Sequence, residues 1–227
     1  MELSANLLPA DLNNGLLQRI LPLLTQEKLG ALLQAWQALK QRLGMEHEGI
    51  YEVLEYDSVL DLKDATGATA VLERREKVRF LQDNVIAYED QIWGEGDPFA
   101  GYECSPGVPV DRYRDGFKWK VLISLRETKQ RGDISEFRFK RTITDGFTEP
   151  NEWLQTEISH RTRHLRVSVI FPQGRPCQQA LLVERNRNRI TRLGASYFSR
   201  LPDGRQMLSW ERGHPAINEL YTLKWQW

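Results

Sequence analysis

The stretch that decides the fold is FKWKVLISLRETKQRGDISEFRFKRTIT, residues 117–144. Its first half has apolar side chains at every second position, and most of the positions between them are polar. The second half repeats this alternation after a turn around Gly132, so we predict a long antiparallel hairpin with one apolar face. The residues on that face are Phe117, Trp119, Val121, Ile123, Leu125, Phe137, Phe139 and Ile143. A second sheet or a helical layer has to cover such a face.

Arg141 breaks the pattern of this hairpin, because it shares the apolar side with Phe139 and Ile143. Two explanations stay open at this stage. The strand bulges at this position, or a buried acidic side chain pairs with the guanidinium group.

The residues from 50 to the end of the chain show sequence patterns that are typical of β-strands. Alternating runs separated by turn signals follow one another along the chain, with almost no helical pattern between them. We predict a mainly β domain over residues 50–227, an antiparallel β-sandwich of about ten strands. The charge run Arg74, Arg75, Glu76 and Lys77 lies within one predicted strand and indicates a sheet edge or a solvated end.

Residues 1–44 are rich in Leu, Ala and Gln, which favours a helical hairpin. Its second helix, from about residue 26 to 43, carries an apolar stripe at helical spacing, and residues 44–49 are typical of a linker. The stripe consists of Leu29, Leu32, Leu33, Trp36, Leu39 and Leu43. Two short helices cannot bury both stripes alone, so we expect this unit to pack on the β-domain, or to bind a second copy or a protein partner.

Composition excludes several classes of protein. The 227 residues contain 31 Lys and Arg and 31 Asp and Glu, so no net charge draws the protein to nucleic acid or to a membrane. No apolar run reaches the roughly 20 residues that span a bilayer. The two cysteines and four histidines lack the spacing of a metal site. We expect a soluble cytoplasmic protein with reduced thiols and without a metal or a cofactor.

Three groups of residues are candidates for chemistry. The irregular stretch 81–116 brings together acids and nucleophiles: Glu95, Asp97, Glu103, Cys104, Ser105 and Asp111. They follow no known catalytic spacing, so solvated loop acids are the simpler interpretation. A second group, Arg185, Arg187, Arg189 and Arg192, would place guanidinium groups along one side of an extended segment that could bind phosphates. Trp93 and Trp153 lie near turns and could stack on a ligand, whereas Trp119, Trp225 and Trp227 fit the core.

These observations lead to one functional hypothesis and two alternatives. We predict a non-enzymatic protein–protein interaction or scaffold subunit that associates through its N-terminal helices. The layout of a helical hairpin before a sandwich resembles, at the level of fold alone, that of bacterial signalling and assembly proteins. The first alternative is a protein that binds nucleic acid or an anionic ligand through the arginine-rich edge, and the second is a hydrolase that uses the acids of residues 95–103.

Overall fold

The structure is a computed structural model that describes residues 49–93, 99, 101–116 and 118–227. The helical hairpin predicted for residues 1–44, with its apolar stripe, lies outside the described residues. The described residues belong to the β-domain predicted for residues 50–227 and to the end of the linker before it.

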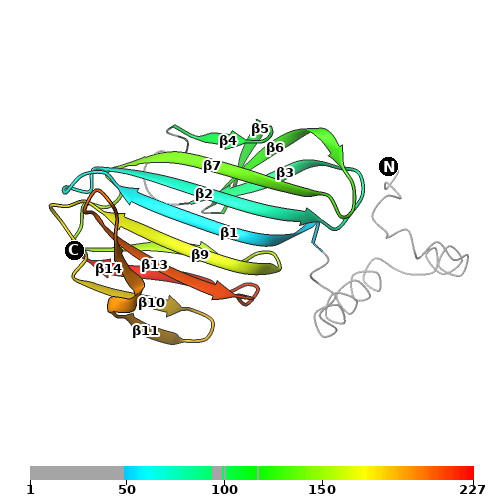
Figure 1. Ribbon diagram of the computed structural model, residues 1–227. Coiled ribbons are helices and arrows are strands. Elements are labelled where there is room, and N and C mark those ends of the chain that lie inside the picture. The colour runs from blue at the N-terminus through cyan, green and yellow to red at the C-terminus, as the bar shows by residue number, and fades with distance from the viewer. Residues whose placement is uncertain (1–48, 94–98, 100, 117) are drawn as a thin grey trace, which may run out of the picture. The chain divides into compact units, whose positions relative to one another are not determined.

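The described chain forms three sheets, which confirms the mainly β class (Figure 1). The large sheet has seven strands in the order β12-β13-β9-β1-β2-β7-β4. In that order, its strands are Phe198–Arg200, Gln206–Gly213, Thr162–Phe171, Tyr51–Leu62, Thr69–Phe80, Ile134–Thr144 and Glu103–Ser105. Figure 1 shows the inner five of these strands side by side.

Two smaller sheets complete the domain. The four-stranded sheet has the order β11-β10-β14-β8, with strands Arg189–Leu193, Gln179–Glu184, Leu220–Gln226 and Asn151–Glu157. The three-stranded sheet has the order β3-β6-β5, with strands Val85–Ile92, Lys118–Lys129 and Val108–Asp115. A short 3₁₀-helix, Ala195–Tyr197, precedes β12.

The hairpin predicted for residues 117–144 is wrong, although both of its strands exist. β6 pairs with β3 and β5, whereas β7 pairs with β2 and β4 in the large sheet. The turn around Gly132, whose φ is +96°, therefore carries the chain from one layer to the other. The backbone of this turn is tied to the end of β2, because the Gly132 amide donates to the Phe80 carbonyl over 2.8 Å. The two apolar faces meet across a core, and they do not lie side by side in one sheet.

The large sheet also departs from a purely antiparallel arrangement. β1 and β9 are parallel, and their register runs from Val53 opposite Thr162 to Asp61 opposite Ile170. Parallel neighbours need a long connection. Here, that connection includes β3, β5 and β6 of the three-stranded sheet and β8 of the four-stranded sheet, whereas β10, β11 and β14 follow β9.

Two apolar cores lie on the same face of the large sheet. One packs that face against the four-stranded sheet, and the other packs it against the three-stranded sheet. β2 contributes to both of them: Ala70 belongs to the first core, and Val78 and Phe80 belong to the second. Between these positions the inward residues of β2 are Leu72, Arg74 and Glu76. The junction of the two covering sheets therefore lies over polar side chains.

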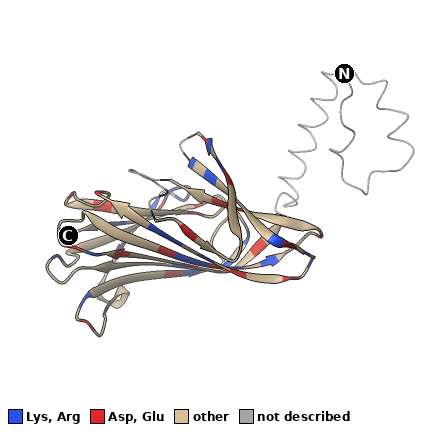
Figure 2. Ribbon diagram, turned by 90° about the horizontal axis from the view of Figure 1, so that it is seen from above, with Lys and Arg blue, Asp and Glu red and all other residues tan. Residues whose placement is uncertain are grey.

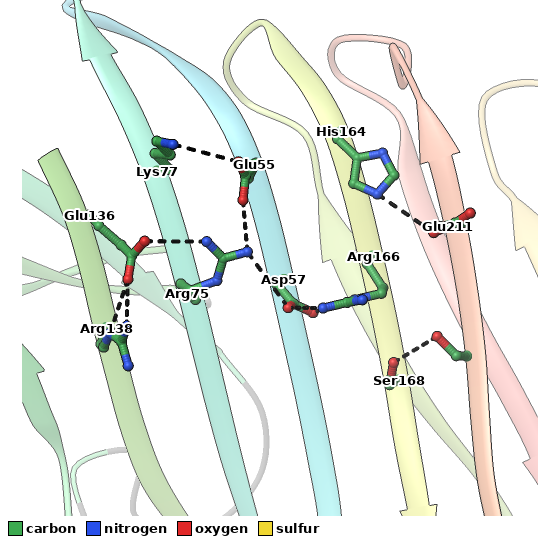
Figure 3. Close-up of polar contacts among 11 residues, drawn as sticks. Glu55, Asp57, Arg75, Lys77, Glu136, Arg138, His164, Arg166, Ser168 and Glu211 are labelled. Carbon is green, nitrogen blue, oxygen red and sulfur yellow. Dashed lines mark hydrogen bonds and ion pairs between the residues drawn. The ribbon is translucent and has the colours of Figure 1, made fainter. Parts of the chain in front are cut away.

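The opposite face of the large sheet is a ladder of ion pairs (Figure 3). Arg75 Nη2 lies 2.8 Å from Glu55 Oε2, Arg75 Nη1 lies 3.3 Å from Glu136 Oε2, and Arg166 pairs with Asp57. The charge run of residues 74–77 thus marks no edge, since β2 lies in the interior of the sheet order. Figure 2 shows acidic and basic residues interspersed along the strands, in keeping with equal numbers of both signs.

Candidate functional site

A cavity of about 360 Å³ lies at the junction of the two covering sheets. Its floor is the inner face of the large sheet, formed by residues of β1, β2 and β7. One wall is the end of β3, at Asp90–Ile92, and the other is β8, of which residues 151–156 all contribute. We call it the central cavity. Its volume lies within the range of about 300–1,000 Å³ that is usual for small-molecule sites.

A buried ionic cluster lies beside this cavity. Arg74 projects from the middle of β2 and pairs with the carboxylates of Glu76 and Asp90, the first at 2.8 Å between Nε and Oε1. Glu76 and Asp90 are 6% and 3% exposed. Two phenols complete the cluster, because Tyr88 donates to Glu76 and Tyr102 donates to Asp90 Oδ2 over 2.9 Å. We call these five residues the Arg74 cluster.

Burial and charge act against each other in the Arg74 cluster. Burial alone lowers the pKa of Arg74, but the neighbouring carboxylates of Asp90 and Glu76 outweigh it and raise that pKa well above its usual value. Burial raises the pKa of Glu76, and the positive charge of Arg74 opposes this effect. The guanidinium also stacks on Phe139, with 4.3 Å between its central carbon and the ring centroid. Arg74 therefore has two carboxylates and an aromatic ring as partners.

Arg141 lines the same cavity and has a different environment. It projects from β7 on the inward face, two positions after Phe139, and the β2–β7 register runs through it without a bulge. Among the described residues, Arg141 has one hydrogen bond, from Nη2 to the backbone carbonyl of Trp93 over 3.3 Å. In the part of the chain that the structure describes, no carboxylate lies within ion-pair distance of it. The bulge that the sequence suggested for Arg141 is therefore absent, and the described residues provide no acidic partner for it.

Burial and the positive charge of Arg74 make the charged form of Arg141 unfavourable in the ligand-free protein. Burial, followed by repulsion from Arg74, lowers the pKa of Arg141 to about 10, so that it stays charged at neutral pH. The nearest buried acid, Asp90, is already held by Arg74 and Tyr102. A guanidinium has five N–H donors, and most of those on Arg141 have no acceptor in the part of the chain that the structure describes. A partly buried cation without a counter-ion is stabilised by any anion that enters the cavity.

The remaining lining contains apolar and acidic side chains, together with Lys140 and several neutral polar residues. The apolar side chains include Leu72, Ile92, Ile143, Phe147 and Leu154. Trp93 and Trp153 also line the cavity, and Trp153 is 49% exposed. The turn between β7 and β8 supplies the exposed acids Asp145 and Glu149. A ligand in the cavity thus meets the Arg141 guanidinium and apolar side chains, and the exposed turn beside them carries two acids.

The four arginines predicted to bind anions lie far along the sequence from this cavity, and none of them lines it. Residues 185–188 form a turn between β10 and β11, so the extended segment expected there does not exist. Arg189 pairs with the fully buried Glu184, and Arg187 lies 3.9 Å from the same carboxylate. Arg185 and Arg192 are exposed. Two of the four thus neutralise a buried acid, and an anion site built from them stays a prediction.

The acids and nucleophiles of the irregular stretch do not converge in the described residues. Glu95 and Asp97 lie outside them, Glu103 and Ser105 are exposed on β4, and Asp111 is exposed on β5. Cys104 packs against a core, and burial raises the pKa of its thiol, which disfavours the reactive thiolate. Among the described residues, no three His, Cys, Asp or Glu side chains are grouped to hold a metal ion.

Sequence reasoning missed the Arg74 cluster and found the cavity only in part. Arg141 stood out because it interrupts an apolar alternation, and Trp93 and Trp153 stood out because they fit no core. Arg74 and Glu76 were hidden in a charge run that usually marks a solvated strand. The available signal was parity: residues 70, 72, 78 and 80 are apolar, and 74 and 76 share their side of the strand.

Comparison with known proteins gives only distant similarities. No known protein family and no curated protein matches this chain. Among solved structures it is similar to a protein from Parabacteroides distasonis described as a protease, with 9% identity, a TM-score of 0.45, and 78% of this chain and 40% of that chain covered. It is also similar to an M1 zinc metallopeptidase from Deinococcus radiodurans, with 12% identity, a TM-score of 0.43, and 76% and 42% covered.

The prediction of a non-enzymatic interaction or scaffold subunit is contradicted, because these matches are to proteases. This chain spans about two fifths of the length of the proteins it matches, and identities of 9% and 12% do not transfer an activity. The function has to be argued from the cavity itself. No helix of the described chain has the length and apolar character needed to cross a bilayer.

Proposed function

We propose that this protein binds a small organic carboxylate in the central cavity, with the carboxylate on Arg141. The observation that carries this proposal is a partly buried guanidinium that lines a cavity, uses one of its donors, and has no carboxylate partner among the described residues. A carboxylate is the preferred occupant, because its two oxygens match the fork of the guanidinium.

The body of the ligand is apolar and compact. Leu72, Ile92 and Ile143 line the cavity next to Arg141, and aromatic rings of Trp93 and Phe147 extend these walls. A volume of about 360 Å³ corresponds to about a dozen water molecules at about 30 Å³ each. This suits a branched or aromatic acid with a short chain, and it is too small for a long lipid.

The test compares acids with their uncharged amides by isothermal titration calorimetry at pH 7. Phenylacetate, isovalerate and N-acetyl-leucine are titrated into the full chain, followed by the primary amide of each. We expect at least one acid to bind at least tenfold more tightly than its amide, because a charge-assisted hydrogen bond contributes about 1.5–3 kcal/mol.

Matched variants assign the binding to the cavity. Arg141→Gln removes the charge that faces the ligand, and Arg138→Gln removes a charge on the outer face of the same strand, where it pairs with Glu136. Binding should weaken at least tenfold in the first variant and stay unchanged in the second. Equal affinity for acid and amide, or full binding by Arg141→Gln, would show that the proposal is wrong.

A further inference from the structure

β8 has one edge without a neighbouring strand among the described residues. It is the last strand of the four-stranded sheet, and all seven of its residues pair with β14 on one side. On its other side lies the central cavity, which residues 151–156 line without interruption. The facing wall, the end of β3, likewise belongs to an edge strand, because β3 pairs only with β6 within the described chain. Backbone donors and acceptors therefore border the cavity.

Unpaired strand edges bind extended chains. A peptide that adds to such an edge gains backbone hydrogen bonds, and alternate side chains enter the pockets beside it. A free acid without a peptide backbone would leave the edge of β8 unused. The geometry of the cavity thus suits a ligand that is itself an extended chain.

The charges of the cavity indicate which end of such a chain enters. Arg141 offers a cation among apolar walls, and Asp145 and Glu149 place negative charge on the exposed turn that leads into β8. A chain with a carboxylate at its inner end and neutral or basic groups outside matches this polarity. A fatty acid matches only the first half of it.

We propose that the ligand is the carboxyl-terminal end of an extended peptide, which adds to β8 as a further strand and places its terminal carboxylate on Arg141. This inference rests on the proposed carboxylate site and narrows the class of ligand. The cavity holds the last one or two residues. Further residues follow β8 towards solvent, and at about 3.3 Å per residue four of them extend about 13 Å.

The experiment distinguishes the contribution of the terminal carboxylate from that of the backbone hydrogen bonds to β8. Four probes are titrated into the full chain at pH 7: N-acetyl-Ala-Ala-Ala-Leu with a free carboxylate, its carboxyl-terminal amide, an analogue with N-methyl groups on alternate amides, and N-acetyl-leucine. The same set is repeated with phenylalanine at the end. Arg141→Gln and the control Arg138→Gln are measured with each probe.

We expect the free-acid peptide to bind at least tenfold more tightly than each of the other three probes, and Arg141→Gln to abolish its advantage over the amide. If the peptide binds no more tightly than N-acetyl-leucine, and both lose affinity in Arg141→Gln, the peptide inference is overturned and the carboxylate site stands. If the N-methylated analogue binds as well as the parent, strand addition is refuted. If no probe binds, the peptide inference fails, and the titration of small acids against their amides decides the proposed function independently.

Discussion

Replacing Arg74 by methionine gives the most demanding test of the Arg74 cluster. The change removes the positive charge that faces Glu76 and Asp90, whose side chains are 8% and 2% exposed, and it removes the contact with the Phe139 ring. Breaking a buried ion pair from one side costs about 3–5 kcal/mol, because the remaining charges have neither water nor a partner. We expect Arg74→Met to lower the free energy of unfolding by that amount.

The matched control is the next residue along the chain. Arg75 has ion pairs with Glu55 and Glu136, but it lies on the outer face of the same strand with 32% of its side chain exposed (Figure 3). Exposed ion pairs contribute about 0–1 kcal/mol. Arg75→Met should therefore cost less than about 1 kcal/mol in urea denaturation followed by tryptophan fluorescence.

The cost of Arg74→Met should also depend on pH. Burial already raises the pKa of Glu76, and the loss of Arg74 raises it further. The folded variant then holds a proton that the unfolded chain has released, so its free energy of unfolding falls as the pH rises above about 4.5, by up to about 1.4 kcal/mol per pH unit. The deficit relative to the wild-type protein should grow between pH 5 and pH 7.

Neutralising the orphaned acids provides the internal check. The triple change Arg74→Met, Glu76→Gln and Asp90→Asn should recover at least half of the loss, since both phenols can still donate to the amide oxygens. The reasoning is refuted if Arg74→Met costs no more than Arg75→Met, if its cost is independent of pH, or if the triple variant recovers nothing.

Local geometry supports three further predictions. Gly67 and Gly132 both have positive φ, but a Cβ on Gly67 would lie 1.8 Å from the Phe147 carbonyl oxygen, whereas one on Gly132 meets nothing within 4 Å. In urea denaturation, Gly132→Ala should lower the free energy of unfolding by about 1–2 kcal/mol, and Gly67→Ala should lower it clearly more. Equal losses in the two variants would contradict this prediction. Burial lowers the pKa of His160, so stability should fall as the pH drops below about 6.5, and His160→Gln should flatten that dependence; an NMR titration that gives His160 a raised pKa would contradict it. Arg141→Met should leave the free energy of unfolding of the ligand-free protein unchanged or raise it by up to about 2 kcal/mol, and a loss of more than 1 kcal/mol would show that Arg141 serves the fold.

Local pattern predicted the strands but not the sheets to which they belong. The alternation within residues 118–129 and 134–144 fixes which side of each strand is buried, and both sides are as predicted. Alternation carries no information about the neighbouring strand, because the same apolar face can pack beside its sequence neighbour or opposite to it. A turn of the right length between the two strands suggested the former, and the structure has the latter.

The parallel pairing of β1 with β9 could not be predicted from the sequence, for the same reason. No local signal joins residues 53–61 to residues 162–170, and the preference for antiparallel hairpins holds only between neighbours in sequence. The site depends on this non-local arrangement, since its floor belongs to the large sheet and its two walls belong to different smaller sheets. Single residues could be flagged from the sequence, but the cavity that unites them could not.

The two arginines of the cavity differ in what the protein provides for them. Both share the inward side of adjacent strands, where a charge is costly, and Arg74 is accompanied by two carboxylates and an aromatic ring. Arg141 receives one backbone carbonyl, although it is equally a residue of the inner face. If inward arginines were tolerated only for packing, both should be neutralised by acids of the fold. Arg74 is neutralised, whereas Arg141 faces a cavity with apolar walls and has no counter-charge among the described residues. This difference is the reason for assigning the carboxylate to Arg141.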